Sequence, residues 1–327
     1  MWAIMKKQAK LSVELAGGLG NQLFQYAALL SIVADKHQNI QLEWSLGHPR
    51  LNAEGLPEIC DYTLPPEVKI SDRKFLRSIG KKTFGYLMRM SVAPKFYERI
   101  PAVRFAIKIF GGTILYFYFG THRVPVVSDK LGYSKLEIFA RKNIILIGYF
   151  QSFRYYQNNG VLDCLRALRL RQSSDSLENF RKIASDEKPL VVHFRFGDYK
   201  NESNFGIPDS TYYCEAIERL WRTGAFSRIW VFSDEIELAK EKFPVQYLDV
   251  VRWIEPVSTS SAENLEIMKL GRGYVIANST YSYWAATLSY DRDAPVIAPS
   301  PWFRNMESPT DLIPTTWILA PAWRDLS

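Results

Sequence analysis

The feature that most constrains the fold is a regular alternation of short apolar runs and amphipathic segments from about residue 165 to residue 310. Runs such as PLVVHFRF, SRIWVFSDE and GYVIAN have the length and apolar character of buried strands, and EIELAKEKF and STYSYWAATLSY have helical periodicity. Strands that alternate with helices at this pace form a parallel sheet with helices on its faces. The pattern therefore predicts a Rossmann-like α/β domain.

The first half of the chain begins with a similar unit, LSVELAGGLGNQLFQYAALLSIVADKH. We expect a strand over 11–16, a tight turn over 17–20 and a helix over 21–36, and we expect NIQLEW and NIILIGYF to be further strands. With 327 residues, of which 47% are hydrophobic, the chain can form two separate cores. We predict an N-terminal domain over 1–160 and a C-terminal domain over 161–327.

The formal charge of +7 is concentrated in one segment, residues 69–108, which holds eleven Lys or Arg residues and two acidic residues. Aromatic and aliphatic residues are interleaved with these cations. A solvated helical face and a contact with an anionic membrane surface both explain this composition. Nucleic-acid binding is disfavoured, because the charge is confined to one segment and no known reader motif accompanies it.

The sequence indicates a reduced, cytoplasmic protein without a resident metal. The opening residues lack the apolar core of a signal peptide, and no apolar run is long enough to span a bilayer. Cys60, Cys164 and Cys214 are too scattered for a zinc site, so reduced thiols are expected. The four histidines show no ligand spacing, and the D-x-D motif at 291–293 is expected in an exposed loop. We expect no metal and no other cofactor.

Polar residues follow the predicted strands of the second domain at the points where these strands end. They form the clusters 193–198, 233–235 and 278–282. In a doubly wound sheet, ligands bind beyond the carboxyl ends of the strands. The sequence therefore predicts that the clusters converge on one crevice.

The residue types in these clusters suit a phosphate ligand. Ser279, Thr280 and Ser282 open a helix, whose N-terminal N–H groups attract anions, although ordinary capping also explains one such residue. Arg195 offers a planar fork that binds phosphate at two points, and the alternative is a salt bridge to Asp198 with no other role. Asp234 suits a ribose hydroxyl or a guanine edge, or a helix cap.

The GGLGNQ segment is a weaker signal, because it lacks the spacing of the dinucleotide fingerprint and therefore disfavours a dehydrogenase. Its glycines fit a close approach of the backbone to a ligand, with Asn21 as a polar contact. A simple tight turn is the competing interpretation.

The motifs GGLGNQLFQYA, IGYFQS, VVHFRFGDY, FSDE, ANSTYSYWAA and PSPWF occur in an order that resembles bacterial alpha-1,2-fucosyltransferases of glycosyltransferase family 11. The resemblance extends from about residue 12 to residue 304 and covers 50–140 poorly. It implies a GT-B-like architecture with two facing Rossmann-like domains. It also implies metal-independent, inverting transfer of L-fucose from GDP-beta-L-fucose to the 2-hydroxyl of a galactose.

The resemblance also assigns roles to the residues of the clusters. Arg195 would hold the GDP diphosphate, His193 and Asp234 would face guanosine, and residues 17–21 would line the cleft between the domains. Arg195 and Asp198 are the expected catalytic residues. The expected nucleotide-sugar-binding residues are Asn21, His193, Arg195, Ser233, Asp234, Asn278, Ser279, Thr280 and Ser282.

The chain departs from the family pattern at Phe196, where a second arginine is usual, and at Phe205 and Tyr283. Phe196 removes a cation, which raises the alternative of a non-catalytic relative that binds a nucleotide or a glycan. The general base is left open between three acids of one loop, Asp198, Glu202 and Asp209. The expected acceptor is a galactose-terminated oligosaccharide or a lipid-linked glycan, with peripheral contact at the inner membrane leaflet.

Overall fold

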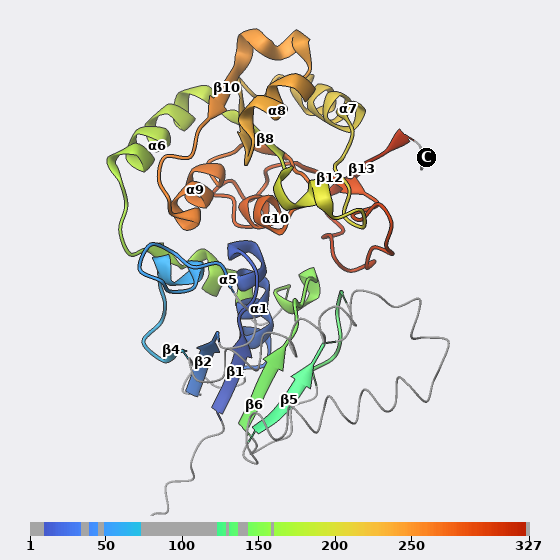
Figure 1. Ribbon diagram of the computed structural model, residues 1–327. Coiled ribbons are helices and arrows are strands. Elements are labelled where there is room, and N and C mark those ends of the chain that lie inside the picture. The colour runs from blue at the N-terminus through green and yellow to red at the C-terminus, as the bar shows by residue number, and fades with distance from the viewer. Residues whose placement is uncertain are drawn as a thin grey trace, which may run out of the picture. The chain divides into compact units, whose positions relative to one another are not determined.

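The fold was analysed in a computed structural model, drawn in Figure 1. The structure describes residues 10–33, 39–44, 49–72, 123–128, 131–136, 143–157 and 160–324. Most of the predicted basic segment, from residue 73 to residue 108, lies outside the described residues. The described helices include none that is long and apolar enough to cross a membrane.

The chain forms two compact units, each with its own internal contacts. The first unit contains residues 1–51 and 63–168, and the second contains residues 52–62 and 169–327. The predicted division into residues 1–160 and 161–327 places the short segment 52–62 in the first domain, whereas in the structure this segment belongs to the second unit.

The first unit contains a five-stranded sheet whose order is β4-β2-β1-β6-β5, and every pairing is parallel. In that order the strands cover Val68–Ser71, Asn39–Glu43, Lys10–Glu14, Asn143–Ile147 and Arg123–Val127. Two helices and a 3-10 helix complete its regular structure among the described residues: α1 (Leu19–Ser31), η3 (Phe153–Tyr155) and α5 (Val161–Arg166).

The second unit contains a six-stranded sheet whose order is β10-β9-β8-β11-β12-β13, again with parallel pairings throughout. In that order the strands cover Val251–Ile254, Arg228–Ser233, Pro189–Phe194, Gly273–Val275, Val296–Ser300 and Ile318–Pro321. The chain builds outward from β8 through β9 to β10, and then crosses over to β11 on the other side of β8. This reversal between β8 and β11 is the switch point of a doubly wound sheet.

Helices cover both faces of this sheet (Figure 1). α7 contacts β8 and α8 contacts β9, whereas α6 and α10 each contact α9. The helices cover Asp175–Glu187 (α6), Ser210–Trp221 (α7), Ile236–Lys242 (α8), Ser261–Met268 (α9) and Thr280–Thr287 (α10). Shorter elements are η1 (Glu58–Asp61), η4 (Gly197–Asn201), η5 (Val245–Val250) and a two-stranded sheet of β3 (Tyr62–Thr63) and β7 (Arg169–Leu170).

The helices of the second unit begin where the sequence supplies a capping side chain. Ser174, Asp209 and Ser260 each accept a hydrogen bond from a backbone N–H of the first turn of α6, α7 and α9, respectively. Apolar strands and capped helices in alternation thus produce two parallel sheets. This arrangement confirms the predicted fold class, α/β with two Rossmann-like units.

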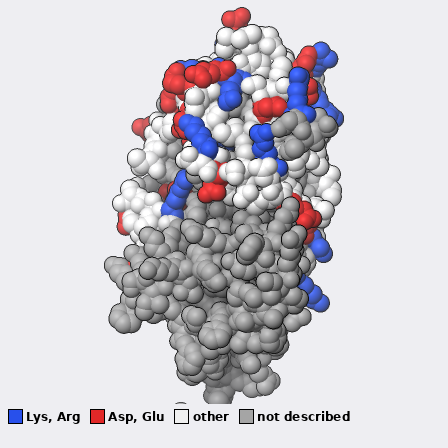
Figure 2. Space-filling model, turned by 45° about the vertical axis from the view of Figure 1, so that its right-hand side comes forward, with Lys and Arg blue, Asp and Glu red and all other residues white. Residues whose placement is uncertain are grey.

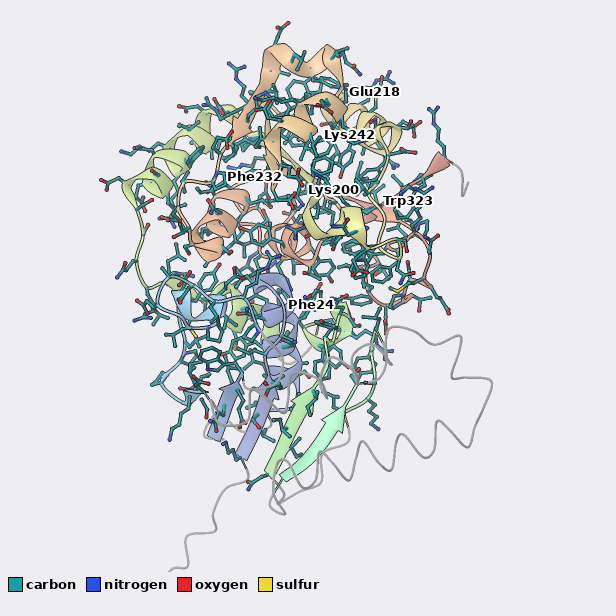
Figure 3. All side chains as sticks on the ribbon, in the orientation of Figure 1. Phe24, Lys200, Glu218, Phe232, Lys242 and Trp323 are labelled. Carbon is teal, nitrogen blue, oxygen red and sulfur yellow. The ribbon has the colours of Figure 1, made fainter. Side chains whose placement is uncertain are left out.

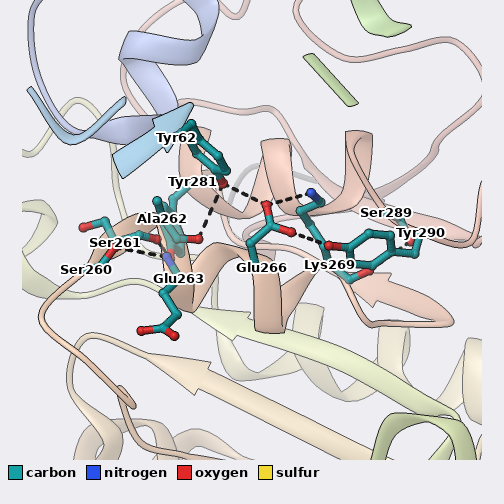
Figure 4. Close-up of polar contacts among 10 residues, drawn as sticks. All are labelled: Tyr62, Ser260, Ser261, Ala262, Glu263, Glu266, Lys269, Tyr281, Ser289 and Tyr290. Carbon is teal, nitrogen blue, oxygen red and sulfur yellow. Dashed lines mark hydrogen bonds and ion pairs between the residues drawn. The ribbon is translucent and has the colours of Figure 1, made fainter. Parts of the chain in front are cut away.

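The segment 52–62 is attached to α9 by a buried polar network, shown in Figure 4. The Glu266 carboxylate accepts hydrogen bonds from the hydroxyl groups of Tyr62 and Tyr290, and its Oε1 atom lies 2.8 Å from the ammonium nitrogen of Lys269. Only 4% of Glu266 and 4% of Lys269 is exposed. The three donors offset the cost of burying the carboxylate.

Nearer the start of α9, two serines hold the same segment. The hydroxyl of Ser260 donates to Asp61 and that of Ser261 donates to Glu58, each over 2.6 Å. The segment from the first half of the chain is therefore part of the second unit through side-chain contacts, and a local sequence pattern does not reveal them.

We predict that Lys269→Met destabilises the second unit by about 3 kcal/mol, because a buried carboxylate that loses its cation is left uncompensated. Urea unfolding measured by circular dichroism should show the shift in midpoint. Lys182→Met, at an exposed position of α6, is the matched control and should leave the midpoint unchanged. Equal midpoints for the two variants would contradict the role of the network.

Candidate functional site

The candidate site of the second unit lies at the carboxyl edge of its sheet, around the switch point. β8 is buried along its whole length and lies between β9 and β11. Arg195 leaves the end of β8, Asp234 follows β9, and Asn278 follows β11. The structure therefore brings three of the predicted polar clusters to one edge of the sheet.

Arg195 is fixed by the carboxylate of Asp234, which lies on the neighbouring strand connection. The guanidinium Nη1 atom lies 3.0 Å from Oδ2 of Asp234, and Oδ1 of Asp234 accepts a hydrogen bond of 2.9 Å from the backbone N–H of Phe196. A Cβ atom on Gly197 would lie 2.5 Å from the same Oδ2 atom, so only glycine leaves room for this carboxylate. The alternative partner considered from the sequence was Asp198, whose side chain lies outside the described residues.

Three further contacts involve the loop that follows Arg195. Lys200 forms an ion pair of 2.5 Å with Glu235, so a second cation of this loop is paired with the connection after β9. The ring of Tyr199 lies 5.6 Å from the guanidinium carbon of Arg195, and the Tyr199 hydroxyl donates to the carbonyl of Asn278 over 3.0 Å. Sequence analysis assigned no role to Tyr199 or Gly197, although both lie in the quoted motif VVHFRFGDY.

His193 is a buried, neutral side chain at the end of β8. It is 5% exposed, and its ring centroid lies 6.2 Å from that of Tyr281 on α10. Burial, together with the positive charge of Arg195, lowers the pKa of His193 to about 3. Its buried Nδ1 atom has no hydrogen-bond partner among the residues that the structure describes. Buried polar atoms are nearly always paired in native proteins, so this atom points to a ligand or a water molecule.

The side chain of Asn278 mainly donates hydrogen bonds to the backbone of the surrounding loops. Its amide nitrogen lies within hydrogen-bond distance of three carbonyl oxygens, those of Phe205, Gly206 and Trp302, at 3.0, 3.0 and 3.1 Å. Its Oδ1 atom is buried and, within the described part of the chain, has no hydrogen-bond partner. The donors of Asn278 are thus occupied by the protein, and its acceptor oxygen is a second buried polar atom at this edge that lacks a partner.

The three hydroxyl residues at the start of α10 have different positions. Ser279 caps the helix by accepting from the N–H of Tyr281, and Ser282 is fully buried and donates to the carbonyl of Ser279 over 3.3 Å. Thr280 is half-buried, and the described residues contain no hydrogen-bond partner for its hydroxyl. Of the three, Thr280 is therefore the one whose hydroxyl is not used by a described residue.

The structure also gives the orientation of Phe196. Its ring is 1% exposed and lies in the hydrophobic core of the second unit, with its centroid 6.1 Å from that of Phe194. From the sequence, Phe196 is expected to remove a cation from the binding site. In the structure the side chain points away from the edge that carries Arg195.

The remaining predicted acids and polar residues of this edge are placed as follows. Asp209 caps α7, accepting from the N–H of Tyr212 over 2.9 Å, and its second oxygen accepts from the N–H of Arg324 over 3.0 Å. Glu202 is exposed, and Ser233 accepts from the N–H of Glu235. Asp209 is thus committed to holding two chain segments together.

Asn21 belongs to the first unit, at the switch point between β1 and β6. Its Oδ1 atom accepts a hydrogen bond of 3.0 Å from Gln151, which follows β6. Gly17 has a φ angle of +69°, and a Cβ atom there would lie 2.4 Å from Nδ2 of Asn21. The glycine is required by this turn, which supports the tight-turn interpretation of GGLGNQ.

The D-x-D motif lies in the turn between α10 and β12. Asp291 pairs with Arg272 over 3.2 Å and accepts from the backbone N–H of Asp293. Within the described ranges, no group of three or more His, Cys, Asp and Glu side chains could hold a metal ion.

Arg195, His193 and the start of α10 determine which ligands the carboxyl edge of the second sheet can bind. A positioned guanidinium, a neutral imidazole and the N-terminus of α10 suit an anionic ligand with polar groups, such as a nucleotide diphosphate. The fold and the site define a doubly wound α/β protein with a cationic edge at the switch point of its second sheet. The model of glycosyl transferase family 11 matches residues 133–318, more than half of the chain, and the protein belongs to this family.

Two curated relatives from Escherichia coli are similar over nearly their whole length. An alpha-1,2-colitosyltransferase is 25% identical over 93% of this chain and 96% of its own, and the O-antigen biosynthesis glycosyltransferase WbnK is 26% identical over 93% and 98%.

Similar solved structures include NodZ alpha-1,6-fucosyltransferase of Bradyrhizobium soaked with GDP-fucose, which is 13% identical, with a TM-score of 0.48 over 90% of this chain and 96% of that chain. A family 9 glycosyl transferase from Veillonella parvula is 11% identical, with a TM-score of 0.48 over 98% and 87%.

The burial of His193 predicts a specific dependence of stability on pH. The unfolded chain protonates this imidazole near pH 6.5 and the folded chain only near pH 3, so the unfolded state binds more protons between these values. The free energy of unfolding should therefore fall as the pH is lowered, by about 2 kcal/mol from this residue between pH 7 and pH 5. Free energies of unfolding from urea titrations at pH 7 and pH 5 should therefore fall by about 2 kcal/mol more for the wild type than for His193→Gln. A parallel pH dependence in both proteins would show that His193 is not buried as a neutral group.

Proposed function

We propose that this family 11 glycosyltransferase transfers L-fucose from GDP-beta-L-fucose to the 2-hydroxyl of a galactose in a glycan acceptor, with inversion and without a metal ion. The observation that carries the proposal is the fixed position of Arg195, held by Asp234 over 3.0 Å at the switch point of the sheet. A guanidinium at this place, at the same edge of the sheet as the N-terminus of α10, suits the two phosphates of a nucleotide sugar.

In the proposed mechanism, the acceptor hydroxyl attacks C1 of the sugar from the face opposite the diphosphate, and the bond between C1 and the diphosphate oxygen breaks. The hydroxyl proton passes to a carboxylate of the loop after β8, Asp198 or Glu202. Negative charge develops on the departing diphosphate, and Arg195 stabilises it because its orientation is set before the ligand arrives. The N–H groups at the start of α10 and the hydroxyl of Thr280 add neutral donors to the same group. The neutral His193 contributes a hydrogen-bonding nitrogen without a competing charge.

The linkage is supported by the relative named alpha-1,2-colitosyltransferase. Colitose is L-fucose that lacks the hydroxyl at carbon 3, so transfer of either sugar can use the same geometry at C1. This relative also makes GDP-colitose a second candidate donor. A comparison of the two donors at equal concentration decides between them.

The proposal predicts transfer of fucose from GDP-fucose to a beta-galactoside in the presence of EDTA, detected by mass spectrometry and by the linkage of the product. Arg195→Ala should lower kcat/KM by about 100-fold, because one charged contact with a leaving group contributes a few kcal/mol. Arg272→Ala, which removes an exposed arginine of the same unit, is the control. GDP binding without transfer to any acceptor would support the non-catalytic alternative and contradict the proposal.

A second experiment separates two roles for Asp234, contact with guanosine and positioning of Arg195. If Asp234 acts through Arg195, Asp234→Asn should weaken GDP and inorganic pyrophosphate alike, each by about 10-fold, because both ligands need the aligned guanidinium. Gly197→Ala should have the same effect, since its Cβ would lie 2.5 Å from the Asp234 carboxylate. The measurement is calorimetric titration, with Asp249→Asn as the control. Loss of GDP affinity with unchanged pyrophosphate affinity would show that Asp234 contacts the base instead.

A further inference from the structure

A pocket of about 390 Å³ lies in the second unit beside the loop that leads to α7. This volume is within the range of small-molecule sites. Its lining residues are Ile207, Pro208, Asp209, Lys242, Arg304, Trp323 and Arg324. The candidate donor site does not use any of their side chains.

The walls of the pocket are held together by hydrogen bonds between distant segments. The N–H of Asp209 donates to the carbonyl of Ala322 and the N–H of Arg324 donates to the Asp209 carboxylate, both over 3.0 Å. The indole N–H of Trp323 donates to the carbonyl of Ile207 over 2.9 Å. The concave shape is therefore built by the fold and does not depend on mobile side chains alone.

The lining has an excess of positive charge. Lys242, Arg304 and Arg324 come from three separate segments, and the one acid, Asp209, uses both carboxylate oxygens to accept backbone N–H groups. A carboxylate oxygen of Glu215 lies 3.9 Å from the guanidinium of Arg324. Lys242 and Trp323 lie on the same side of the second unit in Figure 3, and Figure 2 brings that side forward, with Lys and Arg side chains gathered among a few acids.

The pocket adjoins the candidate donor site through Gly206. A Cβ atom at Gly206 would lie 2.7 Å from Cβ of Arg304 and 2.9 Å from Cζ2 of Trp323. The carbonyl of Gly206 in turn accepts from the amide of Asn278, next to the cap of α10. One loop thus forms a wall of the pocket and a part of the site edge.

We propose that this pocket binds a phosphate group carried by the acceptor, such as the diphosphate of a lipid-linked glycan. The inference rests on the proposed function for the presence of an acceptor. Two guanidinium groups and an ammonium group around one concavity suit a phosphate, which arginine binds at two points. The bound phosphate would hold the acceptor beside the site in which the donor binds.

The test is calorimetric titration at low salt with pyrophosphate and with a short-chain alkyl diphosphate, with every protein carrying Arg195→Gln so that the donor site does not bind these ligands. The double variant Lys242→Gln/Arg304→Gln should weaken alkyl diphosphate binding by about 10-fold, because two charged contacts are lost. Lys182→Gln/Arg272→Gln removes the same charge from exposed positions of the same unit and should have no effect. Unchanged binding in the pocket variant, or no binding to the protein with Arg195→Gln alone, would overturn the proposal.

Further ligands identify the source of the phosphate and its chemical class. Binding of pyrophosphate alone, without the alkyl diphosphate, would show an ion site and would overturn the acceptor assignment. Acetate that binds as well as the phosphates would overturn the assignment to phosphate.

The pocket and the donor site can be tested apart. Arg195→Gln should abolish GDP binding and leave alkyl diphosphate binding intact, whereas the pocket variant should retain GDP binding and transfer to a neutral galactoside. If the wild type fails to bind GDP but still binds the alkyl diphosphate through Lys242 and Arg304, the proposed function fails and the pocket assignment survives.

Discussion

The ion pair between Arg195 and Asp234 depends on one constraint of the fold, the reversal of strand order around β8. Because β8 is buried and lies between β9 and β11, the chain segments that leave these three strands must emerge at one edge. A cation that follows β8 and an acid that follows β9 then meet at 3.0 Å without any nearness in sequence. The architecture creates the pair, and the pair fixes the direction of the guanidinium.

Convergence at this edge could be predicted from the sequence, because buried strands and capped helices leave clear local patterns. His193, Arg195 and Asn278 follow strands that the apolar runs already reveal, and parallel strands share one carboxyl edge. The partner of Arg195 could not be predicted in this way. The choice of Asp234 depends on the space that Gly197 leaves and on the N–H of Phe196, and both are properties of the folded backbone.

Residue type alone also does not distinguish a ligand contact from a structural one. The amide of Asn278 and the hydroxyl of Ser282 are the groups expected in a phosphate loop, and in the structure they donate to backbone carbonyls. Buried loops need the same donors as ligands do, since unpaired carbonyl groups are costly. The attachment of residues 52–62 to α9 escapes sequence analysis for a related reason, because its contacts join residues some two hundred positions apart.

The position of Phe196 changes the electrostatic argument for the site. The ring packs beside Phe194 in the hydrophobic core, so the side chain at this position contributes to the core next to the end of β8. Among the residues that the sequence assigns to the donor site, Arg195 then supplies the directed positive charge, and its effect depends on how well it is oriented. Asp234 lowers the net charge of the edge but holds Arg195 in one geometry, and a preorganised charge stabilises a developing anion more effectively than a mobile one. Orientation by a carboxylate and a glycine would thus compensate for a missing second cation.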